Sequence, residues 1–572
     1  MVVGDSISHG REGDWTWRYR IWEWFRQQDI RVRFVGQYKG TVPQDDPEPP
    51  HPPPLVSEPA QPTPPLRTDG GYAAGVAPEF LANSHHFSAS GRQAYQAQWL
   101  IAEQVASYEP DFCFVQLGFN DLGWCVSGPK DTLASMKRLI DEARSAKPDL
   151  KFAVANVPHR TDLPGREDLP VNTDIYNMLL ARWIPFWNSP ESPIALVRFC
   201  ENYSCGGTTS DAAYDGLHPN ALGEYQLAQA FSRTLVSVFH LGRTELAVPR
   251  EIPSRPLSTP TNFKAISAPS GIIVTWDPVY GAYGYELRVR MAGSADWPLP
   301  CYVAFNRYDT RYCVAGQRWE YQVRASGGDH LKSAWSGVVS AVAHTETAPG
   351  PRNIVTHATP TGFTISWEPP QGQFTGSIDR YGVLAFDRDE PGGFPCVNQG
   401  VRGEFAEMAG LTPGHHYNIA VETWTSVGGG LPAGARSVTV GKETPPVPVC
   451  VRPIAIDDTT IDLRWSGHWD AAGYTIWIRH VPRSNADDSD NVRSRPQRFC
   501  AVTPNIQLAD SASQRRLLYN LEPSVWDLQF AVSSYNGNDE SELSEWMDAS
   551  QPALEEPSLG KGDTIYINLD YL

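Results

Sequence analysis

The first six residues, Met1-Val2-Val3-Gly4-Asp5-Ser6, decide the fold of the N-terminal part of this chain. The first three are apolar and are typical of the end of a buried strand, whereas Gly4, Asp5 and Ser6 all favour a turn. A side chain that directly follows such a strand lies where open α/β sheets place their ligand sites. A serine hydroxyl is a weak nucleophile by itself, so Ser6 needs a base from elsewhere in the chain.

Two later motifs supply the remaining parts of an acyl-transfer site. Gly118-Phe119-Asn120-Asp121 follows an apolar run, and Asp215-Gly216-Leu217-His218 precedes a helical pattern. His218 can accept the serine proton while Asp215 fixes the tautomer of the imidazole. Asn120 offers an amide donor for the oxyanion of a tetrahedral intermediate. Each motif alone also fits an ordinary surface turn, so the prediction depends on their combination at the ends of predicted strands.

The first 245 residues alternate between helical and strand patterns. We expect strands at residues 1–3, 32–35, 112–117 and 151–157 and helices at 17–28, 93–108, 131–146 and 221–239. Such alternation predicts a parallel sheet covered by helices on both faces.

On these motifs, residues 1–245 resemble the SGNH (GDSL-type) hydrolases, a three-layer α/β fold with a flavodoxin-like parallel sheet. The resemblance implies an ester-bond hydrolase with Ser6, Asp215 and His218 as catalytic residues. It implies an oxyanion hole formed by Asn120 and by the backbone N–H of Gly91, which best matches the second block of the family. It implies no cofactor, and the sequence has no paired Cys or His motif that would indicate a metal site.

The flanks of these motifs are similar to the acetyl xylan esterase branch of the carbohydrate esterases. The matching stretches are Val2-Val3-Gly4-Asp5-Ser6-Ile7, Trp17-Arg18, Arg33-Phe34-Val35-Gly36 and Asp215-Gly216-Leu217-His218-Pro219-Asn220. Trp15, Trp17 and Trp124 place indole rings near the expected site, where they would suit a sugar or an acyl group.

A proline-rich insertion interrupts this domain at residues 43–65, where 11 of 23 residues are proline. Proline lacks the backbone donor of a sheet, so we expect an extended or disordered surface loop that does not pair into a sheet. A lid and a peptide ligand are the alternatives to a simple loop extension.

Beyond residue 250, three similar units follow proline-rich joints. Each begins with an alternating strand that ends in a tryptophan, and Trp276, Trp367 and Trp465 lie 91 and 98 residues apart, the size of one β-sandwich. The units resemble fibronectin type III modules, with expected bounds of 257–346, 347–443 and 444–550, followed by a tail at 551–572. We expect the three tryptophans to be core residues rather than sugar platforms.

The corner motif of these modules is complete in one unit only. Leu411-Thr412-Pro413-Gly414-His415-His416-Tyr417 matches it, whereas Trp319 and Trp526 replace its tyrosine in the first and third units. A tyrosine hydroxyl can therefore close the corner in the second unit alone.

Composition restricts the partners of this chain. A net charge of −18 over 572 residues argues against nucleic acid and anionic membranes. No apolar run approaches the ~18–20 residues of a membrane span. The chain begins inside the expected first strand with no signal peptide, so an N-terminal truncation and a cytosolic protein are both open. The modules favour an extracellular protein.

Nine cysteines leave one unpaired if all the others form disulfides. The candidate pairs are Cys200 with Cys205, Cys301 with Cys313 and Cys450 with Cys500, and we expect Cys113 to be a buried free thiol. Spacing does not establish the connectivity.

We therefore predict a secreted serine esterase that removes acyl groups, with acetyl favoured, from a polysaccharide or other glycan. The alternatives are a lipase, lysophospholipase or thioesterase of the same fold, or an inactive adhesion or binding protein. The modules would bind polysaccharide or act as spacers. Residues 1–250 hold every candidate catalytic group, so we expect them to keep full turnover on a small soluble ester.

Overall fold

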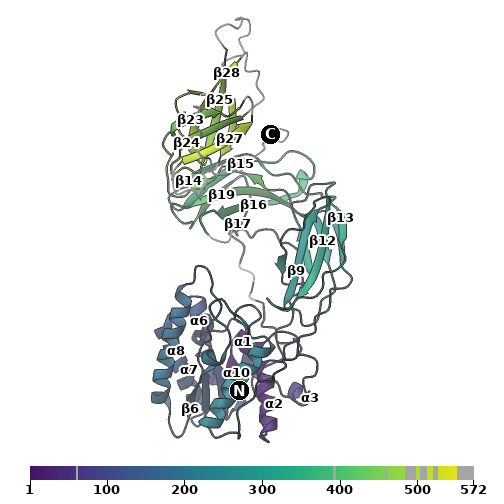
Figure 1. Cartoon of the computed structure of the whole chain (residues 1–572), viewed down its shortest axis with the longest axis vertical. Helices are drawn as coiled ribbons and strands as arrows, with labels where there is room; N and C mark the ends of the chain where they lie inside the picture. Colours follow the sequence, from purple (N-terminus) through teal and green to yellow (C-terminus); the bar gives the residue numbers. More distant parts are fainter. Residues whose placement is uncertain are drawn as a thin grey trace.

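The computed structural model describes residues 1–59, 62, 64–390, 395–457, 460–482, 497–502, 512–518 and 526–549. The expected tail at 551–572 and the side chains of Cys500 and Trp526 lie outside the described residues. Figure 1 shows an α/β domain at the bottom of the molecule, from which three β-sandwiches follow in an arc. We call the sandwiches module 1 (β7–β13), module 2 (β14–β22) and module 3 (β23–β30) in chain order.

The α/β domain is built on one six-stranded sheet with the order β2-β3-β1-β4-β5-β6. Its strands are β1 (Val2–Gly4), β2 (Tyr38–Lys39), β3 (His85–Ser88), β4 (Phe112–Gln116), β5 (Lys151–Ala155) and β6 (Ile194–Val197). All neighbours are parallel except the edge strand β2, which runs antiparallel to β3. The predicted fold class is confirmed.

Helices cover both faces of this sheet (Figure 1), with α2 packed on α10 in one layer and α7 packed on α5 and α8 in the other. The helices are α1 (Ser6–His9), α2 (Trp17–Gln27), α3 (Pro78–Ala82), α4 (Ala94–Ala97), α5 (Ile101–Tyr108), α6 (Phe119–Gly123), α7 (Pro129–Ala146), α8 (Asp168–Trp187), α9 (Phe199–Asn202) and α10 (Ala221–Ser237). Apolar side chains at helical spacing explain α7, which buries Met136, Leu139 and Ile140.

One predicted strand is wrong. Residues 32–35 form no strand, and Phe34 makes only a single bridge to Ser84. The apolar alternation there reflects ring packing, because Phe34 is buried against Phe80 at 6.0 Å between ring centroids. The edge position beside β3 is instead occupied by β2.

Each module is a sandwich of two antiparallel sheets. Module 1 contains β7 (Lys264–Ala268), β8 (Gly271–Thr275), β9 (Gly284–Met291), β10 (Cys301–Val303), β11 (Arg307–Thr310), β12 (Arg318–Ser326) and β13 (Val339–Val342). Module 2 contains β14 (Arg352–Thr359), β15 (Gly362–Glu368), β16 (Ile378–Asp387), β17 (Pro395–Val401), β18 (Phe405–Ala409), β19 (His416–Thr425), β20 (Gly428–Gly429), β21 (Ala433–Gly434) and β22 (Val438–Thr439), with a short 3₁₀ turn, η1 (Thr375–Ser377).

Module 3 repeats this plan. It contains β23 (Val449–Ala455), β24 (Thr460–Ser466), β25 (Gly473–Pro482), β26 (Gln497–Val502), β27 (Ala512–Leu518), β28 (Trp526–Asn536), β29 (Asp539–Glu540) and β30 (Met547–Asp548). In every module a three-stranded sheet faces a sheet of four or more strands.

The repeated tryptophans form the module cores, as predicted. Trp276, Trp367 and Trp465 are buried, and each packs edge-on against a tyrosine at 5.1, 5.1 and 5.4 Å between ring centroids. In module 2 the hydroxyl of Tyr417 accepts the backbone N–H of Thr412 at 3.0 Å, which closes the corner. Trp319 cannot reproduce this bond, and its indole N–H has no partner in module 1.

The proline-rich insertion does pair with a sheet, contrary to expectation. Leu55 forms a parallel bridge with Gly400 of β17, and the Gly400 N–H donates to the carbonyl of Pro54 at 2.9 Å. Proline lacks a donor but keeps its acceptor, so the bond is available. We call the described residues 43–59 the strap, because they join the α/β domain to module 2.

The predicted disulfides within the described residues are not formed. Cys200, Cys205, Cys301 and Cys313 are free thiols, as are Cys450 and the buried Cys113. Three of these thiols donate to backbone carbonyls instead: Cys205 to Gly216, Cys301 to Leu287 and Cys313 to Thr310.

Candidate active site

The three side chains of the predicted relay meet at the carboxyl end of the sheet. The hydroxyl of Ser6 lies 2.8 Å from Nε2 of His218, and Nδ1 of His218 lies 2.7 Å from Oδ2 of Asp215. With Nδ1–H donated to the carboxylate, Nε2 is free to accept the serine proton. Sequence separation is 212 residues between Ser6 and His218, so the fold alone brings them together.

The Asp-x-x-His spacing has a local explanation. Oδ1 of Asp215 accepts the backbone N–H groups of Leu217 and His218 at 3.1 and 2.8 Å, which leaves Oδ2 for the imidazole. Gly216 permits the turn with φ of 76°. Burial alone would raise the pKa of Asp215, but these hydrogen bonds outweigh it and hold the pKa below its usual range.

Ser6 begins α1 directly after β1. Asp5 caps this helix by accepting the N–H of Ile7 at 2.9 Å, and Ser6 itself is only partly buried, so its hydroxyl is reachable. Burial raises the pKa of Asp5 to about 7, against the opposing hydrogen bond from Ile7.

The two predicted oxyanion residues lie on neighbouring turns. Gly91 follows β3 and Asn120 follows β4, the strands on either side of β1. The side-chain amide of Asn120 donates to the carbonyl of Arg92 at 3.0 Å, which ties the two turns together. Gly91 has φ of 76°, and a Cβ there would lie 2.7 Å from the ring of Trp124. Gly91, Asn120 and Ser6 therefore follow three adjacent strands.

The three expected indole rings have different positions. Trp124 is 59% exposed beside Gly91, and Trp15 lines a cavity next to Tyr214. Trp17 is not part of the site, because it is fully buried and stacked on Phe231 at 4.6 Å between ring centroids. Its helical position on the inner face of α2 explains the difference.

Sequence reasoning missed the aromatic neighbours of His218. Tyr214 stacks beside the imidazole at 5.6 Å between centroids, and Tyr283 of module 1 stacks on Tyr214 at 3.7 Å. Arg11, just after α1, faces the hydroxyls of Tyr214 and of Tyr302, also from module 1. Tyr214 adjoins the Asp-x-x-His motif and could have been suspected, but no sequence signal connects module 1 with the site.

Two cavities flank the turn that carries Asp215 and His218. One, of about 230 Å³, lies between the α/β domain and module 1 and is lined by Trp15, Tyr214, Glu224, Arg255, Tyr283 and His330, among others. The other, of about 500 Å³, is formed by residues 159–173, and its Thr161 donates its N–H to the carbonyl of Gly216 at 2.8 Å. Its lining combines charged side chains with apolar ones: Arg160, Asp162, Arg166 and Glu167 on one hand, and Leu163, Pro164, Leu169 and Pro170 on the other.

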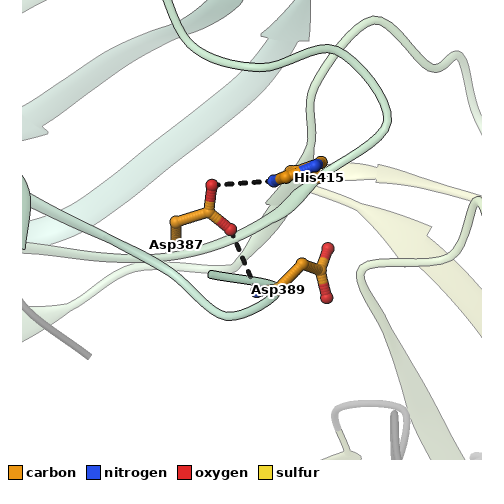
Figure 2. A group of neighbouring side chains, drawn as sticks. All are labelled: Asp387, Asp389 and His415. Atoms are coloured by element: carbon orange, nitrogen blue, oxygen red, sulfur yellow. Dashed lines mark hydrogen bonds and ion pairs between the residues drawn. The ribbon is translucent and has the colours of Figure 1, made fainter. Parts of the chain in front are cut away.

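A separate cluster in module 2 was not visible as a sequence motif. Asp387, Asp389 and His415 place possible ligand atoms within 4.8 Å of one another (Figure 2). Asp387 accepts from Nδ1 of His415 and from the backbone N–H of Asp389, both at 2.9 Å. The first of these bonds raises the pKa of His415. These hydrogen bonds explain why the three side chains lie together: they join the end of β16 to the start of β19.

Comparison with known proteins agrees with this description. Residues 60–225 match the GDSL-like Lipase/Acylhydrolase family and residues 348–440 match the Fibronectin type III domain. The first match includes Gly91, Asn120, Asp215 and His218 but begins after Ser6.

Similar solved structures cover the α/β domain. They include a mutant acetyl esterase with an acetate ion, and a carbohydrate esterase family 3 protein from Talaromyces cellulolyticus. Each is 21% identical and covers 42% of this chain and 97% of its own, with a TM-score of 0.31. Protein sidekick-2 of Gallus gallus is 25% identical over 281 residues, 41% of this chain, and the chain spans 12% of that protein's length.

The α/β domain is therefore a GDSL-like acylhydrolase domain, a class of domain that hydrolyses ester bonds. More particularly, the chain joins this SGNH-type domain to three β-sandwich modules, and module 2 holds the match to the Fibronectin type III domain. Among the helices of the described residues, none is long and apolar enough to cross a membrane.

Proposed function

We propose that the protein is a serine esterase in which Ser6, His218 and Asp215 act as nucleophile, base and orienting acid. The observation that carries this proposal is the unbroken series of contacts at 2.8 and 2.7 Å from the serine hydroxyl through the imidazole to the carboxylate. A neutral imidazole held in this tautomer is the base that a serine nucleophile requires.

The reaction proceeds through an acyl-enzyme. Oγ of Ser6 attacks the ester carbonyl as its proton passes to Nε2 of His218, and Asp215 stabilises the imidazolium. The oxyanion receives hydrogen bonds from the amide of Asn120 and the N–H of Gly91. His218 then gives its proton to the leaving alcohol, and water releases the acid from Ser6 by the same steps.

We infer that the natural ester is a small acyl group, acetyl in particular, on an extracellular glycan. The polar side chains in the lining of the cavity at residues 159–173, among them Arg160, Asp162 and Arg166, suit a hydroxyl-rich alcohol part. The exposed indole of Trp124, beside Gly91, offers a ring on which a sugar can stack. Modules of the fibronectin type would act outside the cell, with polysaccharide contact or spacing as their role.

Comparison of substrates tests this assignment. Acetylated xylan, p-nitrophenyl esters of short and long chains, and lysophospholipid are assayed with the wild type and with Ser6→Ala. We expect acetate release from xylan, little cleavage of long chains, and loss of nearly all activity in Ser6→Ala. A fluorophosphonate probe should label Ser6 in the wild type. Ser145→Ala, an exposed serine on α7, is the matched control and should label and turn over normally.

Two other outcomes would redirect the proposal. Preference for long acyl chains would favour a lipase or lysophospholipase of the same fold. Absence of labelling together with absence of hydrolysis would leave the adhesion alternative.

Asn120→Ala should lower kcat by about 10²–10³ with little change in KM, since its amide acts on developing charge. A change in KM alone would make Asn120 a substrate-orienting residue.

A further inference from the structure

We propose that module 1 completes the active site, and that its Tyr283 is a positioning residue that holds the nucleophile turn and the histidine turn in register. This inference rests on the proposed roles of Ser6 and His218. It assigns to a fibronectin-type module a part in the chemical step, in addition to any binding or spacing role.

The first contact is a continuous stack of three rings. Tyr283 lies on Tyr214 with centroids 3.7 Å apart and planes inclined by 20°, and Tyr214 lies beside His218 at 5.6 Å and 19°. Both tyrosines are buried, with 5% and 8% of their surface exposed. The Tyr214 N–H also donates to the carbonyl of His218 at 2.9 Å, so a displacement of Tyr214 moves the catalytic turn.

The same tyrosine reaches the other side of the site. Its hydroxyl donates to Oδ1 of Asp14 at 2.7 Å, and Oδ2 of Asp14 accepts the N–H of Arg11 at 2.7 Å. Arg11 lies two residues after α1, the helix that begins with Ser6. Tyr283 is therefore joined both to the segment that follows the nucleophile and to the turn that carries the base.

A second loop of module 1 touches the histidine turn directly. The N–H of Asp329 donates to the carbonyl of Tyr214 at 2.7 Å. At Gly328, whose φ is 96°, a Cβ would lie only 2.4 Å from that carbonyl oxygen. This close approach restricts the position of the Tyr214 backbone from module 1.

These contacts bear on catalysis because acyl transfer tolerates little displacement. Misplacement of a reacting group by about 1 Å can cost 10²-fold in rate. Asp215 and His218 lie on a short glycine-containing turn that its own domain holds at Gly216 and module 1 holds through Tyr214. If module 1 were only attached there, its removal would affect stability alone. If it positions the turn, the chemical step itself must slow.

The test uses the full-length protein and the variant Tyr283→Leu, with p-nitrophenyl acetate as substrate. We expect kcat to fall by about 10²-fold with KM nearly unchanged, and the rate of fluorophosphonate labelling at Ser6 to fall in parallel. Tyr283→Phe keeps the ring on Tyr214 but loses the hydroxyl's two hydrogen bonds, one donated to Asp14 and one accepted from Arg255, so it should retain far more activity than Tyr283→Leu. Tyr280→Leu is the matched control, because within the described part of the chain Tyr280 hydrogen-bonds the catalytic domain at the carbonyl of Tyr72 alone. Its kcat should be unchanged.

The outcomes separate this inference from the proposed function. A wild type that neither hydrolyses the ester nor labels at Ser6 would refute the proposed function itself. An active wild type with normal kcat in Tyr283→Leu would overturn the positioning role and leave the proposed function standing, as would equal losses in Tyr283→Leu and Tyr280→Leu. If Tyr283→Leu does not fold, Gly328→Ala decides. It displaces Tyr214 while Tyr283 stays in place, and it should lower kcat too.

Discussion

Modules 1 and 2 share a fold, yet they contact the catalytic domain in different ways. Module 1 uses loops: Tyr283, the Gly328 loop and the linker residue Arg255 reach the turns around Ser6 and His218. Module 2 uses a sheet edge, where β17 receives the strap. The shared geometry of the sandwich therefore does not determine what a module does; its loops and edges do.

The ion pairs at the two contacts also differ, in the exposed fraction of their side chains. Arg255 and Asp14 have 9% and 5% of their side chains exposed, whereas Arg380 and Glu58, which join module 2 to the strap, have 10% and 37%. Arg255 also donates to the carbonyl of Glu12 at 3.0 Å and to the hydroxyl of Tyr283 at 2.7 Å. The two arginines are buried to the same extent, so the contacts differ in their acids: Asp14 is buried, whereas Glu58 is partly exposed.

The largest expected effect is on stability at the buried pair. Arg255→Met leaves the carboxylate of Asp14 buried without its cation, which should lower the free energy of unfolding by about 3–5 kcal/mol. Arg380→Met removes a pair whose acid is partly exposed and should cost much less, because solvent screens such a pair. Calorimetry of both full-length variants measures the difference. Equal losses would mean that the two contacts are alike.

The pH dependence of stability tests how far water is excluded from the interface between module 1 and the α/β domain. Glu224 lines its cavity, and burial raises the pKa of Glu224 to about 7, with Arg20 opposing the shift. A raised pKa in the folded state gives stability that is present near pH 4 and lost as the pH rises through about 7. The loss is about 3 kcal/mol.

Glu224→Gln should remove this loss. The free energy of unfolding of the variant, relative to that of the wild type, should therefore be higher at pH 8 than at pH 5. Oε1 of Glu224 accepts the N–H of Thr16 at 2.9 Å, and glutamine can keep that bond. Thermal unfolding at the two pH values is the measurement. Asp5, with a raised pKa of its own, should leave a residual slope in both proteins. An unchanged slope in the variant would show that Glu224 is not desolvated.

Shortened chains test separately how modules 1 and 2 contribute to catalytic activity. Residues 1–346 should keep the kcat of the full chain on p-nitrophenyl acetate, because module 1 remains. Residues 1–250 should lose about 10²-fold, although the sequence alone led us to expect full turnover. Circular dichroism must show that both chains are folded. Equal activity of the two chains would place module 1 outside the catalytic machinery.

The smallest expected effect concerns the strap. A Cβ at Gly400 would lie 2.3 Å from the carbonyl oxygen of Pro53, so Gly400→Val should release the strap from β17. Limited proteolysis should then cut within residues 43–59 faster than in the wild type, with kcat on the small ester unchanged. Arg402→Met, on the same module, is the control and should be cut at the wild-type rate. Protection of the strap in Gly400→Val would show that it is held elsewhere.

The sequence predicted those features that depend on local pattern. Short motifs identified the neighbourhood of Ser6, Asn120 and His218, because Ser6 and Asn120 follow the ends of parallel strands that share one edge of the sheet, and His218 directly precedes the helix α10. The module tryptophans were predicted as core residues because alternation marks the inner face of a sandwich. The catalytic roles of these residues remain predictions that the variants above test.

The missed features depend on contacts between distant segments. The helix α8 was not predicted because it has no single apolar face: Leu180 and Ile184 are buried, while Met178 and Phe186 are 63% and 76% exposed. Residues 32–35 alternate as a strand would, but ring packing satisfies them. Tyr283 carries no local signal at all, since its partners Tyr214 and Asp14 lie 69 and 269 residues away.

The bridge between Leu55 and Gly400 has a consequence for solubility. An exposed edge strand presents free donors and acceptors to which a second molecule can add its own strand. The strap occupies that position on β17, and its prolines accept a hydrogen bond from the sheet without presenting an N–H on their outer side. The N–H of Leu55, the bridging residue, donates to the side chain of Glu58 within the strap and is not offered to another strand. Where it bridges Gly400, the insertion therefore occupies an edge position that a strand of a second molecule could otherwise use.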